Sequence, residues 1–139
     1  MDRYLDTTRI GPMWLRQPEV AEVVAAEIRG ATEHELGAWV VMSNHVHMLS
    51  RPLIEAGQLM RRIKGRTARQ ANLLLERTGQ PFWQADTYDH RVRNPEEFAK
   101  IVRYIENNPV VAGFATSPEK YRWSSAWEGR AGFSLQRRL

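Results

Sequence analysis

Hydrophobic residues recur at helical spacing in three stretches of the chain. Across residues 18–29, valines and an isoleucine return every three or four positions behind a proline that suits the first turn of a helix. The longer segment 56–77 has a stripe of leucine and isoleucine, and Gly65 is a weak point where a bend or break is expected. A third helix follows Asn94, which can cap it, and is expected to end at Pro109. The pattern therefore predicts three amphipathic helices.

Shorter segments show the composition and alternation of β-strands. Residues 36–42 and 45–50 flank a Ser-Asn turn and are predicted to form a hairpin, and residues 87–93 are predicted to form a third strand. Residues 1–17 show no clear period, so irregular structure is expected there. Residues 128–139 are expected to be a frayed tail. Strands and helices thus mix along one chain, which indicates an α+β fold.

The length and composition of the chain predict one cytoplasmic domain over residues 1–139. A chain of 139 residues is long enough for a single hydrophobic core. No apolar stretch approaches the roughly 20 residues of a membrane span, and the N-terminus lacks the apolar core of a signal peptide. The absence of cysteine excludes disulfides and thiolate metal sites, so a reducing compartment is expected.

Positive charge is concentrated in one part of the second predicted helix. Lysine and arginine number 20 in the whole chain against 16 acidic residues, which gives a formal net charge of +4. Within residues 61–69 there are cations and no acid, and we call these the basic cluster: Arg61, Arg62, Lys64, Arg66 and Arg69. Such a cluster is either a phosphate-binding face or a solvated helix face, and charge alone does not separate the two.

Two pairs of residues suggest metal and phosphate chemistry. In a strand, His45 and His47 share one face and can lean onto one ion, although two partly exposed strand histidines are the plain alternative. Tyr104 and Asn108 lie about 40° apart around the third helix, and Glu106 points away from them. A tyrosine hydroxyl can attack a phosphodiester beside a metal ion. Imidazole ligands favour Mn²⁺, or Mg²⁺ held loosely.

Several motifs together resemble those of one enzyme family. The segment WVVMSNHVH, which ends at His47, resembles the His-hydrophobic-His strand of the single-tyrosine HUH transposases, and of the REP-associated tyrosine transposases in particular. Further motifs follow in the family's order, namely PFWQ (81–84), YDH (88–90), RYIENNPV (103–110) and YRWSSA (121–126). The resemblance covers about residues 36–126, and the combination is more specific than any single motif.

The resemblance implies a ferredoxin-like α+β domain, in which an antiparallel sheet holds the histidines and the tyrosine helix lies against it. His45 and His47 match the family's metal ligands, Tyr104 matches its nucleophile, and Asn108 matches the position of the third ligand. The implied reaction is cleavage and rejoining of single-stranded DNA next to a hairpin through a 5′-phosphotyrosine. The implied cofactor is Mg²⁺ or Mn²⁺.

The same resemblance assigns cations to DNA binding. The basic cluster would bind hairpin phosphates, Arg91 and Arg93 would hold the strand near the site, and Trp83 would stack on unpaired bases. Family members usually begin with a strand that residues 1–17 do not predict, which leaves open a sheet without its first strand. Three functions therefore stay open: an active transposase acting as monomer or homodimer, a truncated and inactive module that binds DNA hairpins, and a metal-dependent hydrolase of a small substrate.

Overall fold

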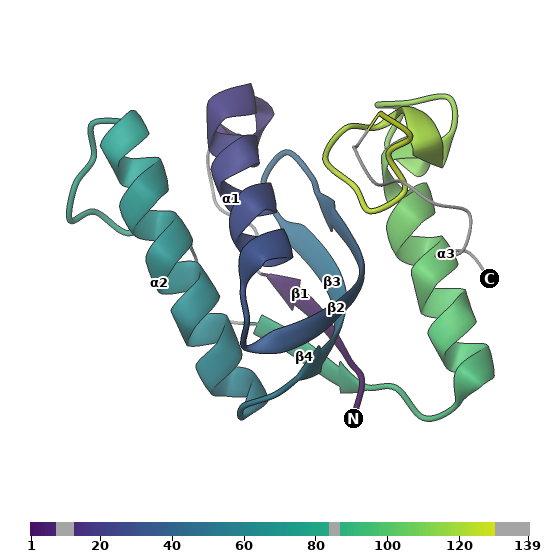
Figure 1. The fold of residues 1–139 in the computed structure, drawn as a ribbon. Helices are drawn as coiled ribbons and strands as arrows, with labels where there is room; N and C mark the ends of the chain where they lie inside the picture. The colour runs from purple at the N-terminus through teal and green to yellow at the C-terminus, as the bar shows by residue number, and fades with distance from the viewer. Residues whose placement is uncertain (8–12, 84–86, 130–139) are drawn as a thin grey trace.

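A computed structural model of the chain describes residues 1–7, 13–83 and 87–129. In that part of the chain four antiparallel strands form one sheet in the order β2-β3-β1-β4, with three helices packed on it (Figure 1). The elements are β1 (Arg3–Thr7), η1 (Trp14–Arg16), α1 (Pro18–Gly30), β2 (His34–Val41), β3 (Val46–Pro52), α2 (Ala56–Leu74), β4 (Thr87–Arg91), α3 (Pro95–Val111) and η2 (Pro118–Lys120). The predicted α+β class is confirmed.

The prediction that residues 1–17 are irregular is wrong. Arg3–Thr7 forms β1, which lies between β3 and β4 and pairs Leu5 with Met48 on one side and with Asp89 on the other. Leu5 is buried in the core, whereas its neighbours in the strand are polar or partly exposed. One buried residue in so short a strand leaves a weak hydrophobic pattern. The sheet nevertheless has its central strand.

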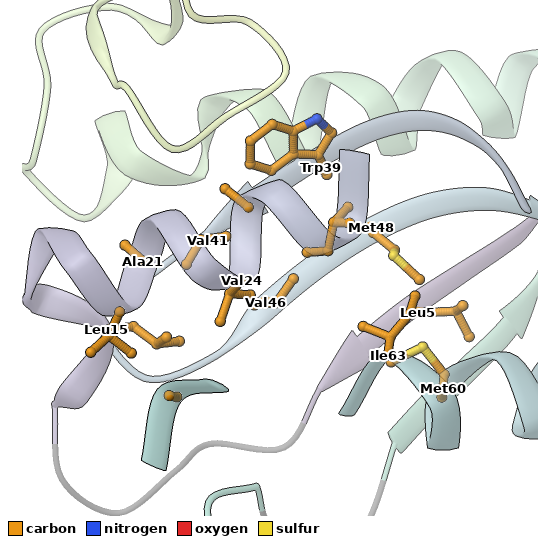
Figure 2. Close-up of a cluster of buried hydrophobic side chains, with 14 of the residues drawn as sticks. Leu5, Leu15, Ala21, Val24, Trp39, Val41, Val46, Met48, Met60 and Ile63 are labelled. Carbon is orange, nitrogen blue, oxygen red and sulfur yellow. The ribbon is translucent and has the colours of Figure 1, made fainter. Parts of the chain in front are cut away.

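The sheet separates two layers of hydrophobic packing. Met48 faces α1 and α2 and joins the larger cluster, in which Ile63 of α2 also lies (Figure 2). Leu49, the next residue of β3, packs instead with Ile105 of α3 in a second cluster. Side chains alternate along a strand, so His47 points to the same face as Leu49. The fold therefore turns His47 toward the helix that carries Tyr104.

The helices lie close to their predicted positions. α1 and α2 match the predicted segments 18–29 and 56–77 within a few residues, and α2 continues through Gly65 without a break. The side chain of Asn94 accepts a hydrogen bond from the backbone of Glu97, as expected of a helix cap. The prediction that the helix ends at Pro109 is wrong, because α3 continues two residues further.

The predicted hairpin is present with shifted bounds. β2 begins two residues earlier than expected and β3 begins at Val46, so His45 lies immediately before β3 and not within it. A backbone hydrogen bond of 2.8 Å from Met42 to the His45 carbonyl closes the turn. β4 ends at Arg91, two residues before its predicted end. These shifts leave the two histidines adjacent to the sheet's α3 face.

Two further expectations concern the C-terminal tail and membrane-spanning helices. The predicted frayed tail, residues 128–139, lies outside the described residues from residue 130 onward. Among the helices that the structure describes, none combines the length and apolar character needed to cross a bilayer.

Candidate functional site

One pocket of about 570 Å³ gathers the four residues that the motifs singled out. His45 and His47 line it from the start of β3, and Tyr104 and Asn108 line it from α3. The volume is within the roughly 300–1,000 Å³ typical of ligand pockets. Two segments that lie far apart in the sequence therefore contribute to one cavity.

The two histidine rings are neighbours in this pocket. Their ring centroids are 4.8 Å apart and the rings are nearly perpendicular, at 89°. His47 is almost fully buried, with 4% of its surface exposed, and His45 is partly buried. The Nδ1 of His45 donates to the amide oxygen of Asn44 over 2.9 Å, so in this tautomer the ring's lone pair is on Nε2.

The central strand β1 contributes two side chains that sequence analysis missed. The Tyr4 hydroxyl lies 2.8 Å from Nδ1 of His47, and the Asp6 carboxylate lies 3.5 Å from the same nitrogen. The strand register places Asp6 directly opposite His47. If Nδ1 carries the proton it donates to these oxygens, and Nε2 keeps its lone pair for an ion. The only sequence signal for this strand is the apolar Leu5 between Tyr4 and Asp6, which is too weak to predict it.

The surroundings of His47 favour its neutral form. Burial, with a smaller contribution from the nearby His45, lowers the pKa of His47 to about 4. Burial also raises the pKa of Tyr4 well above its ordinary value, and Asp6 adds to that effect. Tyr4 therefore stays protonated, and His47 is in the unprotonated state that a metal ligand requires.

Tyr104 stands over the histidines with its side chain accessible. Ile105, the next residue of α3, is buried against the sheet and holds the helix in place. The Tyr104 ring is 55% exposed and meets His47 and Tyr4 edge to face, at centroid distances of 5.8 and 6.3 Å. Tyr88 is equally exposed and contacts Tyr4 in the same manner, but it does not line the pocket.

Asn108 is the residue that the motifs predicted as the third ligand. Among the described residues there is no group of three or more His, Cys, Asp or Glu side chains that could hold a metal ion. Glu106 is buried and accepts a 2.7 Å hydrogen bond from Ser125, and it does not line the pocket, as the helix geometry predicted. The amide of Asn108 does line the pocket, together with Asp6 and Asn44, which contact the histidines.

The basic cluster lies on α2, on the opposite face of the sheet from Tyr104. Acidic side chains from other elements neutralise part of it. Arg66 lies 2.8 Å from Glu33 and 3.1 Å from Glu27, and Arg62 lies 3.6 Å from Glu33. The hydrogen bond from Arg66 is the main cause that lowers the pKa of Glu33 to about 2. Arg66 is therefore engaged in holding α1, α2 and the start of β2 together.

The remaining predicted cations lie on α2, on β4 and just after β4. A smaller hollow of about 250 Å³ is lined by Arg61 and Lys64 of α2 and by Asp89 of β4. Alternation along β4 places Arg91 on the same face as Asp89 and not beside Tyr104. Arg69 and Arg93 are exposed. DNA binding by these residues stays a prediction.

Trp83 also lies away from the pocket. Its indole N–H donates to the Thr67 hydroxyl over 2.8 Å, and its ring contacts Phe82. Both Trp83 and Phe82 pack with the larger hydrophobic cluster, on the α2 side of the sheet. Trp83 is thus not placed to stack on a base at the tyrosine.

Comparison with known proteins identifies the class to which this fold and site belong. Residues 16–108, more than half of the chain, match the family model of IS200-like transposases, and the chain belongs to this family. No curated protein matched the chain.

Two solved structures show the same fold. A REP-associated tyrosine transposase bound to a REP hairpin is 20% identical, with a TM-score of 0.67 over 89% of this chain and 75% of that one. A candidate transposase from Deinococcus radiodurans R1 is 21% identical, with a TM-score of 0.54 over 77% of this chain and 89% of that one. The resemblance noted from the motifs is confirmed at the level of family and fold.

Proposed function

We propose that this transposase cleaves and rejoins single-stranded DNA beside a hairpin, with Tyr104 as the nucleophile. One observation carries the proposal: an exposed tyrosine and two histidines, of which the buried His47 favours its neutral form, line the same pocket. Membership of a transposase family supports DNA as the substrate. The similar structure bound to a REP hairpin supports a hairpin as the recognised form.

The chemistry follows from the position of the Tyr104 hydroxyl. Its oxygen attacks the scissile phosphorus and loses its proton to solvent, the bond between phosphorus and O3′ breaks, and the departing O3′ takes up a proton. The products are a 5′-phosphotyrosine and a free 3′-OH. Because the tyrosyl ester conserves the phosphodiester linkage, a 3′-OH can attack it and rejoin strands without a nucleotide cofactor.

The donor set fits a divalent cation, Mg²⁺ or Mn²⁺. His45 and His47 can each offer Nε2, and Asn108 can offer its amide oxygen. When bound, the ion would offset the negative charge that develops on the phosphate. Two imidazoles suit Mn²⁺ better than Mg²⁺, so tighter binding of Mn²⁺ is expected. Calorimetric titration with Mn²⁺ tests these three ligands. Asn108→Ala should weaken Mn²⁺ binding, and Asn107→Ala, at an exposed neighbouring position, is the matched control.

A binding module without cleavage is the alternative that the sequence left open. The main reason for that alternative was the expectation that the sheet lacks its first strand, but β1 is present between β3 and β4. No observation favours hydrolysis of a small substrate. The cleaving transposase is therefore the function that the site supports best.

A covalent-adduct assay tests the proposal. The protein is incubated with Mn²⁺ and a pool of DNA hairpins whose single-stranded flanks are randomised, and products are separated on a denaturing gel. A 3′-end label should migrate with the protein, whereas a 5′-end label should appear in a shortened free strand. Tyr104→Phe should abolish the adduct, and the equally exposed Tyr88→Phe should retain it. DNA binding without any adduct in the wild type would establish the binding module instead.

A further inference from the structure

An exposed aromatic ring lies at the edge of the same pocket. Phe114 lines the cavity together with the catalytic candidates, and 49% of its surface is exposed. Leaving an apolar ring in water forgoes the free energy of its burial. The lining also includes polar side chains, Ser43 and Asn44 among them. The pocket thus combines one apolar ring with hydrogen-bonding groups.

The backbone holds Phe114 in a fixed place at the end of α3. The helix ends in a two-hydrogen-bond motif in which Gly113 donates to the Val110 carbonyl over 3.0 Å and Phe114 donates to the Pro109 carbonyl over 2.8 Å. Gly113 adopts the left-handed conformation that this motif requires, with φ of 82°. Phe114 is therefore held at a defined position relative to Tyr104 on the same helix.

A second aromatic residue supports the ring from one side. Tyr121 lies roughly parallel to Phe114, at 21° and a centroid distance of 6.2 Å. The Tyr121 hydroxyl donates to the Val41 carbonyl over 2.7 Å, which fastens it to β2. Tyr121 therefore supports the Phe114 ring from one side. Because Phe114 is half exposed and lines the pocket, the rest of its ring is accessible to a ligand.

We propose that Phe114 is a stacking platform for an unpaired nucleobase of the DNA strand held at Tyr104. The proposal rests on the proposed function, because that function brings a single strand into this pocket. Every base has a π-face, and an aromatic side chain that stacks on one contributes about 5- to 150-fold in affinity. Polar groups such as Asn44 are in the same pocket to meet the base edge or the backbone.

Binding measured without cleavage tests the platform. In a Tyr104→Phe background, the affinity for single-stranded DNA is compared with and without Phe114→Ala, with oligonucleotides in which each base in turn is abasic. Phe114→Ala and Phe114→Leu should each weaken binding about 5- to 150-fold, and Phe114→Trp should restore it. Val111→Ala is the matched control, because Val111, the last residue of α3, is apolar and 81% exposed but does not line the pocket.

The abasic oligonucleotides identify the base that stacks on Phe114, because removal of that base and Phe114→Ala should have non-additive effects on affinity. One abasic position should weaken binding to the Phe114-containing protein and have little further effect once Phe114→Ala is present. The stacking proposal would be overturned if every abasic position weakened binding to Phe114→Ala as much as it weakens binding to the Phe114-containing protein. It would also be overturned if Phe114→Ala and Phe114→Leu both bound DNA with unchanged affinity. A change of oligomeric state in Phe114→Ala would also overturn it, by showing that the ring covers a second copy.

The experiments distinguish failure of the cleavage proposal from failure of the stacking proposal. A wild-type protein that forms no adduct refutes cleavage, while the coupling between Phe114 and one base is still measurable. An adduct that forms normally without any such coupling refutes the platform alone.

Discussion

The hydroxyl of Tyr4 lies 2.8 Å from Nδ1 of His47, and this contact joins the central strand of the sheet to the proposed metal site. The rings of the two residues also stack, with centroids 5.9 Å apart. Hydrogen bonds to the distal nitrogen of a ligating histidine set its tautomer and its orientation. Tyr4 is therefore a positioning residue, and Asp6 supports the same nitrogen from 3.5 Å.

Replacement of Tyr4 should separate positioning from folding. Tyr4→Phe keeps the ring and removes the hydroxyl, so Mn²⁺ affinity should fall roughly 10- to 100-fold. Isothermal titration calorimetry gives the affinity, and thermal unfolding of the metal-free protein checks the fold. Tyr88→Phe is the control, because Tyr88 contacts Tyr4 but not His47. Equal affinities of Tyr4→Phe and wild type would show that His47 is oriented without this bond.

Two arginines of the basic cluster should behave differently. Arg66 binds Glu33 and Glu27, so Arg66→Ala should lower the free energy of unfolding by about 1–3 kcal/mol. Arg69 is exposed, and Arg69→Ala should leave stability nearly unchanged. Urea denaturation measures both effects. The opposite ranking would mean that the ion pairs of Arg66 contribute little.

The same pair tests where hairpin phosphates bind. If the exposed side of α2 contacts DNA, Arg69→Ala should lower affinity and reduce the slope of log affinity against log salt by about one unit. Filter binding over a range of salt concentrations measures this slope. An unchanged slope would place the phosphates elsewhere on the protein.

His34 should make stability depend on pH. Its Nε2 donates to the Ile28 carbonyl over 3.0 Å, and its Nδ1 faces the Ser50 hydroxyl at 2.6 Å, so the buried ring is satisfied in its neutral form. Burial lowers its pKa below the ordinary value of 6.5. The unfolded chain therefore binds the proton more readily, and stability should fall as the pH drops below about 6.5.

The His34→Gln variant isolates this dependence. Urea unfolding at pH 7.5 and at pH 5.5 should show a larger loss in the wild type than in His34→Gln, because the buried His47 contributes to both proteins. Equal losses would show that His34 is already free to protonate in the folded state.

A single hydroxyl connects α3 to the segment that follows it. Ser125 donates to Glu106 over 2.7 Å and accepts from the Trp39 backbone over 3.0 Å. Ser125→Ala should therefore cost about 1–3 kcal/mol of unfolding free energy, because a buried carboxylate loses a partner. Thermal or urea unfolding checks this, and Ser117→Ala, outside this network, is the control. A variant as stable as the wild type would show that Glu106 is satisfied without Ser125.

The predictable parts of the molecule are those whose determinants are local. The cap at Asn94 and the apolar spacing of the following helix predicted α3, and the spacing of Tyr104 and Asn108 on it predicted their common side. The His-x-His motif marked residues that do line the pocket with them. That these two pairs share one cavity was suggested by the family resemblance, because strand-helix packing is not encoded in either motif alone.

The parts that were missed depend on partners distant in sequence. β1 is stabilised by pairing on both edges, so Leu5 alone left too weak a pattern to predict it. The acids that neutralise Arg66 are Glu27 and Glu33, which lie outside the basic cluster. Pro109 is buried in the last turns of α3, where tertiary packing outweighs its tendency to end a helix.

The place of β1 in the middle of the sheet also bears on the order of assembly. During synthesis the first strand leaves the ribosome early, but its pairing of Arg3 with Arg91 must wait for β4. At about 5–20 residues per second that delay is of the order of several seconds. The hairpin of β2 and β3 can form in the meantime, whereas the complete sheet requires closure of a long loop. The histidine site should thus mature late, after nearly the whole domain has been made.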